Sequence, residues 1–170
     1  YAPGDRIFIV GFSRGAYIAR ALAGMIAAKG LLDATQNTLS DKNNAYRLGS
    51  AVWYDYRTAM SQSKADWRTK LANMAIDLPA FLQQSVPANQ LIKAPIEAVA
   101  VWDTVGSLGI PAYTLQNTTL DVFQFADRVL SPGVKHGVQA VAVDERRADF
   151  TPTLWDADPR IMQVWFPGGH

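Results

Sequence analysis

The 170-residue sequence contains no cysteine and only two histidines. The lack of cysteine excludes disulfides, thiolate nucleophiles and cysteine-based zinc sites, although it identifies no cellular compartment. An excess of charge is missing as well, because the formal net charge is +1 and no basic run extends beyond Arg146-Arg147. The sequence therefore gives no sign of the basic surface that a nucleic-acid partner requires.

Long apolar runs are also absent, since Lys, Arg, Asp or Pro interrupts each run before the ~20 residues that a membrane span needs. The hydrophobic fraction of 49% over 170 residues is nevertheless enough for the core of one domain. The sequence opens at Tyr1 almost directly on an apolar run and stops at His170. We therefore expect residues 1–170 to form a single, partial domain from a larger protein.

A Gly-x-Ser-x-Gly motif, with Gly11, Ser13 and Gly15, is the most informative pattern in the chain. It follows the apolar residues 7–10 and precedes an alanine-rich segment that begins at residue 16. This order of strand, turn and helix predicts a nucleophile elbow, in which the two glycines remove Cβ atoms that would collide in the sharp turn. The alternative is a structural glycine turn without chemistry.

Strands alternate with helices along the sequence, which is typical of a parallel α/β sheet. Asn, Gln, Ser and Thr become frequent over residues 33–93, which we interpret as a helical insertion between sheet strands. That insertion is either a substrate-binding cap or an ordinary pair of crossover helices. The predicted strands are 7–10, 96–102 and 161–166, and the predicted helices are 14–29 with Gly30 as C-cap, 43–61, 64–84, 119–130 and 132–143.

A serine nucleophile needs a base, and the base works best when a carboxylate orients it. The chain offers Ser13, Asp103 and His170 in the order that α/β-hydrolases use, and each follows a predicted strand. The carboxyl ends of parallel strands meet at one edge of a sheet, so we expect these three side chains to lie together. The other histidine, His136, falls inside the helix predicted over 132–143 and is the less favoured base.

The acid of this predicted triad has two candidates. Asp103 directly ends a predicted strand, although an aspartate there can also serve as a helix N-cap or turn residue. Asp144 and its neighbour Glu145 rank second, because they are predicted to end a helix beside Arg146 and Arg147, where a solvated or ion-paired role is typical.

The oxyanion of the tetrahedral intermediate needs N–H donors, and the backbone N–H of Arg14 is the expected one because it follows Ser13 at a helix N-terminus. A second donor normally comes from a loop after an earlier strand, which this sequence lacks. Three tryptophans are candidates either for an acyl pocket or for the core: Trp102, Trp155 and Trp165.

Four ordered motifs carry a family resemblance. They are Gly-Phe-Ser-Arg-Gly-Ala at 11–16, Val-Trp-Asp-Thr-Val-Gly at 101–106, Asp-Glu-Arg-Arg at 144–147 with Phe150 and Pro152, and Val-Trp-Phe-Pro-Gly-Gly-His at 164–170. Together they resemble the uncharacterised α/β-hydrolase domain family that includes phospholipase effectors of bacterial type VI secretion. The resemblance implies an α/β-hydrolase-like fold, the triad Ser13, Asp103 and His170, and ester hydrolysis with glycerophospholipid as the favoured substrate.

The resemblance also implies partners: a lipid or ester substrate, a membrane surface contacted through that substrate, and an immunity or secretion partner. It implies a bacterial cytoplasmic protein or an effector delivered to the periplasm of a target cell. The serine mechanism requires no metal and no organic cofactor. Relatives begin with an Asp-Gly-containing strand and continue past the histidine, so we expect a fragment that lacks the first strands and is inactive or poorly folded in isolation. Two other functions stay open, an esterase of small soluble esters and a catalytically silent domain that binds a partner.

Overall fold

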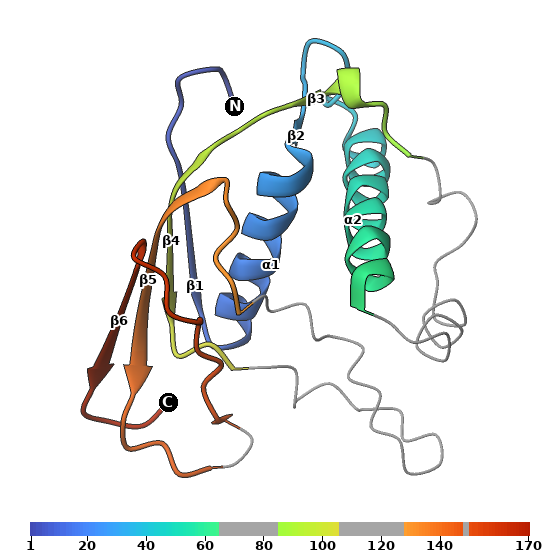
Figure 1. Ribbon diagram of the computed structural model, residues 1–170. Helices are drawn as coiled ribbons and strands as arrows, with labels where there is room; N and C mark the ends of the chain where they lie inside the picture. Colours follow the sequence, from blue (N-terminus) through green and yellow to red (C-terminus); the bar gives the residue numbers. More distant parts are fainter. Residues whose placement is uncertain (65–84, 106–127, 148–149) are drawn as a thin grey trace, which may run out of the picture. The chain divides into compact units, whose positions relative to one another are not determined.

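The computed structural model describes residues 1–64, 85–105, 128–147 and 150–170. These residues divide into two compact units, one made of Tyr1–Ala27 with Ala94–His170 and the other of Ala28–Lys93 (Figure 1). The insertion expected over 33–93 falls within the second unit. Its role as a cap, and the assignment of the chain as one catalytic domain, stay predictions.

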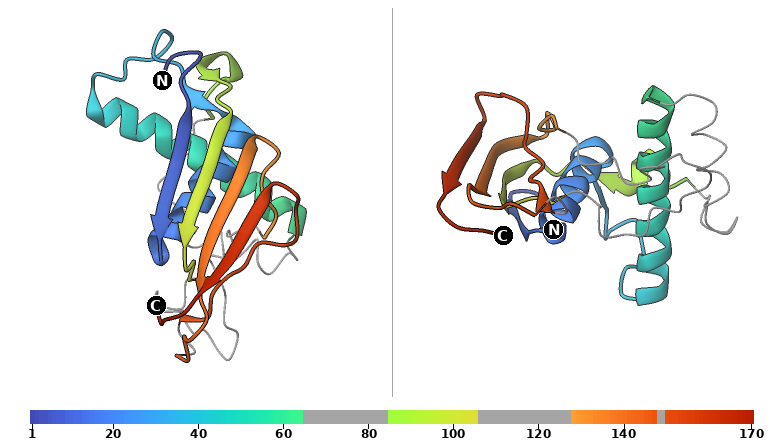
Figure 2. Two further views of the ribbon diagram at one scale, coloured as in Figure 1. Left: turned by 90° about the vertical axis from the view of Figure 1, so that its left-hand side faces the viewer. Right: turned by 90° about the horizontal axis from the view of Figure 1, so that it is seen from below.

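A four-stranded sheet forms the centre of the first unit. All neighbouring strands are parallel, and their order is β1-β4-β5-β6. The left view of Figure 2 shows the four strands side by side, with helix α1 behind them. The predicted parallel α/β sheet is confirmed. Its strands are β1 (Ile7–Phe12), β4 (Ile96–Trp102), β5 (Val134–Ala142) and β6 (Ile161–Phe166).

Helix α1 (Arg14–Lys29) has the bounds that the sequence predicts, and Gly30 follows it with a φ of +93°, a left-handed conformation suited to a glycine C-cap. Its buried residues are mostly small, which allows the helix to approach the sheet closely. A Cβ placed on Gly133 would lie 2.9 Å from the Cβ of Ala27, so the turn before β5 also requires a small residue.

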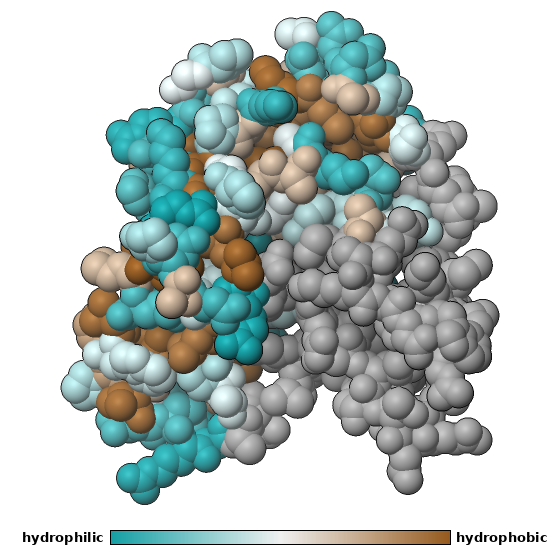
Figure 3. Space-filling view, in the orientation of Figure 1, coloured by the Kyte–Doolittle hydropathy of each residue, from teal (hydrophilic) through white to brown (hydrophobic). Residues whose placement is uncertain are grey.

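The core between this helix and the sheet is built by β-branched side chains. Ile96, Val99 and Val101 of β4 are at most 1% exposed. Burying a side chain of this size stabilises a fold by roughly 1.5–3 kcal/mol. Strand residues alternate between the two faces of the sheet, so Phe8 and Val10 of β1 lie on the face opposite helix α1 and are exposed. Hydrophobic residues accordingly reach the surface on the left side of Figure 3, where Figure 1 places the sheet.

The helix predicted over 132–143 is wrong, because Val134–Ala142 forms strand β5. Pro132 and Gly133 lie in the preceding turn rather than in a first helical turn. Strand β5 pairs with β4 on one side and β6 on the other, and its branched valines fill such a position well. Sheet pairing between distant segments thus overrides the local helix signal. His136 consequently lies on this strand.

Two other predicted helices fall largely outside the described residues. Of the helix expected over 119–130, only residues 128–130 are described, and they are not helical. Of the helix expected over 64–84, residue 64 ends helix α2 and residues 65–84 lie outside the description.

The second unit contains helix α2 (Lys42–Lys64), which confirms the helix predicted over 43–61. A short antiparallel pair, β2 (Leu31–Leu32) with β3 (Leu91–Ile92), joins the two ends of this unit and was not predicted. A single turn of 3-10 helix, η2 (Ala88–Gln90), precedes β3. Within the described parts of the chain, neither α-helix has the length and apolar character needed to cross a membrane.

Candidate active site

Ser13 occupies the turn between β1 and α1 with a φ of +58°, a conformation that non-glycine residues rarely adopt. A Cβ on Gly11 would lie 2.5 Å from the Gly15 carbonyl oxygen and 2.7 Å from the Ala16 Cα, so only glycine fits there. Among the described residues, a Cβ on Gly15 would meet no atom within 4 Å outside the backbone of its own helix. The steric reason given for Gly11 therefore holds, whereas the described residues show no such collision at Gly15.

Asp103 directly follows β4 and also has a positive φ, of +44°. Its backbone N–H donates to the Ala140 carbonyl oxygen at 2.7 Å, and its carboxylate Oδ1 accepts from the Ala142 N–H at 3.2 Å. Two bonds to strand β5 thus fix both the backbone and the carboxylate. The sequence pattern gives no sign of this left-handed conformation, which depends on the neighbouring strand.

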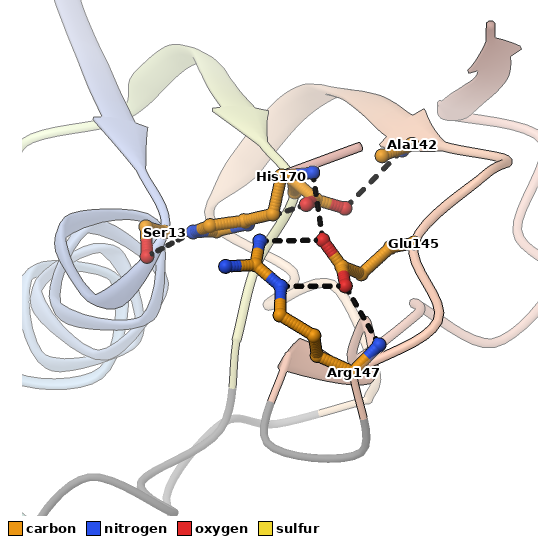
Figure 4. A network of polar contacts seen from close by, with 6 residues as sticks. Ser13, Ala142, Glu145, Arg147 and His170 are labelled. Carbon is orange, nitrogen blue, oxygen red and sulfur yellow. Dashed lines mark hydrogen bonds and ion pairs between the residues drawn. The ribbon is translucent and has the colours of Figure 1, made fainter. Parts of the chain in front are cut away.

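The structure brings Ser13, Asp103 and His170 into one line of contacts, and Figure 4 shows the imidazole of His170 directed at Ser13. The His170 Nε2 lies 2.7 Å from the Ser13 Oγ, and its Nδ1 lies 2.5 Å from the Asp103 Oδ2. The side chains of His170 and Asp103 are only 7% and 6% exposed. Because the three residues follow the carboxyl ends of β1, β4 and β6, the sheet itself places them at one edge.

Two aromatic rings lie against the imidazole of His170. The Phe12 ring stacks on it with a centroid distance of 4.9 Å, and the Phe150 ring is tilted against it at 4.7 Å. Such contacts restrict rotation of the imidazole and leave its two nitrogens directed at the polar neighbours. Neither ring was singled out from the sequence as a support for the histidine.

The second-ranked candidates make other contacts than the one expected of a triad acid or base. Asp144 Oδ2 accepts the backbone N–H of Gly168 at 2.7 Å, in the loop that carries His170, while the imidazole contacts Asp103. His136 pairs with Ala98 in the sheet, four residues before the Ala140 that pairs with Trp102. That spacing is roughly 13 Å of strand, which separates His136 from the sheet edge where Asp103 lies.

Glu145 and Arg147 form an ion pair next to the histidine. The Arg147 Nε donates to Glu145 Oε1 at 2.9 Å, and Nη2 donates to Oε2 at 2.7 Å. This guanidinium, with the backbone N–H groups of Arg147 and His170, holds the pKa of Glu145 well below its usual range. Sequence reasoning assigned them to a solvated or ion-paired helix end; the ion pair is present, but it lies in the loop after a strand. Their membership of the Asp-Glu-Arg-Arg motif was the available signal of a larger role.

A pocket of about 230 Å³ adjoins His170. Apolar side chains contribute much of its lining, among them Phe12, Trp102 and Phe166. Of the other tryptophans considered for such a pocket, Trp155 is buried, with the guanidinium of Arg20 over its ring at 4.6 Å.

Arg14 begins helix α1 directly after Ser13, so its backbone N–H lies in the first helical turn, where intrahelical acceptors are missing. Among the residues that the structure describes, no three His, Asp or Glu side chains gather into a group that could hold a metal ion.

Comparison with known proteins gives a family match over the full sequence. The family model described as "T6SS, Phospholipase effector Tle1-like, catalytic domain" matches residues 1–170. The chain is also similar to the "Uncharacterized protein YEL023C" of Saccharomyces cerevisiae, with 28% identity over 165 residues. This alignment covers 97% of the chain but 21% of the yeast protein, so the chain spans about a fifth of that relative's length. No solved structure gives a significant match.

Proposed function

The chain belongs to the Tle1-like catalytic domain family of type VI secretion phospholipase effectors, and from this membership we propose that it hydrolyses carboxylic esters of phospholipids through an α/β-hydrolase mechanism. The observation that carries the proposal is the chain of contacts from Ser13 through His170 to Asp103, at 2.7 and 2.5 Å. The sequence order of these residues and the strained turn at Ser13 support it further.

In this proposal His170 is the general base. Its Nε2 takes the proton of Ser13 as Oγ attacks the ester carbonyl carbon, and Asp103 accepts the Nδ1–H and stabilises the imidazolium that forms. The tetrahedral intermediate then collapses, and the imidazolium protonates the departing alcohol. His170 then deprotonates a water molecule, which attacks the acyl-serine and forms a second tetrahedral intermediate. This intermediate collapses, the imidazolium returns the proton to the Ser13 Oγ, and the fatty acid is released.

The negative charge of each tetrahedral intermediate is placed near the start of helix α1. The N–H of Arg14 is the proposed donor, and the helix N-terminus adds a favourable partial charge. Removing one such donor typically lowers kcat by roughly 10²- to 10³-fold.

The pocket beside His170 favours a lipid over a small polar ester. Phe12, Trp102 and Phe166 present apolar surface to this 230 Å³ space, which suits the hydrocarbon part of an acyl or glyceride group. A small soluble ester would leave much of that surface in water. Phospholipid is therefore the proposed substrate class. Membership of the effector family also leads us to propose an immunity or secretion partner.

The proposal is tested by labelling the full-length protein with a fluorophosphonate and measuring its intact mass, with Ser13→Ala and His170→Ala alongside. We expect one adduct on the wild type and none on either variant. Well-folded wild type without an adduct would contradict the mechanism and favour a silent binding domain. Esters of increasing acyl length, below and above their micelle concentration, then separate the substrates, because a lipase gains activity on aggregated long chains and a small-ester esterase does not.

A further inference from the structure

Glu145 lies in the loop after β5, three residues beyond Ala142, and its side chain is only 4% exposed although it carries a charge. Within the described residues, its polar contacts go to two residues. Besides the two bonds from the Arg147 guanidinium, Oε1 accepts the Arg147 backbone N–H at 2.7 Å, and Oε2 accepts the His170 backbone N–H at 2.9 Å. Figure 4 shows Glu145 between these two residues, with His170 reaching on toward Ser13.

The loop that carries His170 needs such an attachment. It contains Gly168 and Gly169, and Gly168 has a φ of +126°, so the backbone before the histidine has high conformational freedom in isolation. Two carboxylates hold this loop: Asp144 accepts the Gly168 N–H, and Glu145 accepts the N–H of His170 itself. The second bond acts on the residue whose imidazole must face the serine.

Arg147 extends the same support to the imidazole ring. Its guanidinium lies over the Phe150 ring at 4.0 Å from the ring centre, and Phe150 lies against His170 at 4.7 Å. The ion pair with Glu145 fixes the guanidinium, which in turn favours one position of the Phe150 ring. Glu145 therefore restrains the histidine along two routes, through its backbone and through its aromatic neighbour.

We propose that Glu145, held by Arg147, is a positioning residue that fixes His170 so that its imidazole meets both Ser13 and Asp103. This inference rests on the proposed function, because it assigns a role in the same site. Glu145 is not a catalytic residue in this scheme, since its contacts are with the His170 backbone and with Arg147. Its negative charge is balanced by Arg147 and does not compete with that of Asp103.

The test uses the full-length protein with Glu145→Ala and the shape-preserving Glu145→Gln. Glu97→Ala is the matched control, since Glu97 also accepts from a cation, Lys135 at 2.9 Å, but lies near the start of β4 at the far end of the sheet. The first readout is the second-order rate of fluorophosphonate labelling. The second is the far-downfield proton NMR signal of an imidazole Nδ1–H bonded to a carboxylate, which requires no reaction.

We expect Glu145→Ala to lower the labelling rate by roughly 10- to 100-fold, the cost typical of a small misplacement of a catalytic group. On an ester substrate, kcat falls and KM changes little. Glu145→Gln, which keeps an acceptor for the His170 N–H, recovers part of the rate. Glu97→Ala stays within about twofold of the wild type. The downfield signal broadens or disappears in Glu145→Ala and persists in Glu97→Ala.

Labelling of folded Glu145→Ala at the wild-type rate, with the downfield signal retained, would overturn the inference while leaving the proposed function intact. If the wild type is not labelled at all, the proposed function fails, and the NMR comparison alone decides on the positioning role. Loss of the downfield signal in Glu145→Ala but not in Glu97→Ala then supports the positioning role of Glu145. A wild type without the signal overturns that role. If Glu145→Ala does not fold, Glu145→Gln gives the same comparison with a smaller expected effect.

Discussion

The two glycines of the elbow give the sharpest test of the local geometry. A Cβ atom added at Gly11 would clash with the backbone of α1, whereas one added at Gly15 would not meet the described residues. In Gly11→Ala the new Cβ would lie 2.5 Å from the Gly15 carbonyl oxygen and 2.7 Å from the Ala16 Cα. Ordinary contacts of a Cβ begin at about 3.4 Å, so an overlap of close to 1 Å must be relieved. Both opposing atoms belong to the backbone of α1, and no side-chain rotation removes the clash.

The expected cost follows from this overlap. Forcing an extra methyl group into a packed site typically costs about 1–3 kcal/mol, and each kcal/mol lowers Tm by roughly 2–4 °C in a domain of this size. Gly11→Ala is therefore expected to lower Tm by roughly 2–12 °C. Gly15→Ala adds a methyl group that meets none of the described residues, within helix α1, where alanine is favoured over glycine by up to about 1 kcal/mol. Its Tm is expected to stay level or to rise by a few degrees, on the order of 4 °C at most.

Thermal unfolding followed by circular dichroism measures both values, and fluorophosphonate labelling reports on Ser13 in the same samples. Gly11→Ala is expected to label much more slowly than the wild type, because relieving the clash shifts the turn that holds Ser13. Gly15→Ala is expected to retain labelling. A Gly11→Ala protein with unchanged Tm and labelling, or a Gly15→Ala protein less stable than Gly11→Ala, would refute this description of the turn.

Two further predictions concern carboxylates around His170. Asp103→Asn keeps the shape of the side chain but disfavours the required imidazole tautomer, so fluorophosphonate labelling is expected to slow by roughly 10⁴-fold, and a loss below tenfold would count against Asp103 as the triad acid. The pKa of Glu145 is held below its ordinary value of 4.5, chiefly by the Arg147 guanidinium. The ionised Glu145 carboxylate therefore stabilises the fold fully above about pH 4.5, and this stabilisation is lost as the pH falls toward the lowered pKa. The Tm difference between wild type and Glu145→Gln, measured by calorimetry across a pH series, should be constant near neutrality and shrink in acid; a difference that widens in acid would contradict it.

The elements around Ser13 could be predicted from sequence because their signals are local. The apolar run of β1, the glycine motif and the alanine-rich helix with Gly30 after it are contiguous, and α1 begins and ends where predicted. The placement of Asp103 and His170 beside Ser13 agrees with the prediction from strand ends, because parallel strands share one polarity. Their catalytic roles stay predictions.

Strand β5 shows where sequence reasoning failed. Ser131-Pro132 has the features of a helix start, and the valines that follow permit either structure until β4 and β6 are known to flank them. The error carried over to Glu145, which was expected at a solvated or ion-paired helix end. It is ion-paired with Arg147, but in the loop after β5, where it lies beside His170. The positive φ of Asp103 and the rings against the imidazole arise from contacts between distant segments, which local patterns do not encode.

The site residues lie far apart in the sequence, so the contact between them forms only as the sheet folds. Ser13 and His170 are 157 positions apart and meet only when all four strands have paired in the order β1-β4-β5-β6. During synthesis the elbow emerges before the histidine, so a growing chain displays a serine that His170 has not yet activated. If the proposed chemistry holds, hydrolysis cannot begin before β6 has docked. A growing chain in which β6 has not yet docked would then leave the surrounding membranes intact.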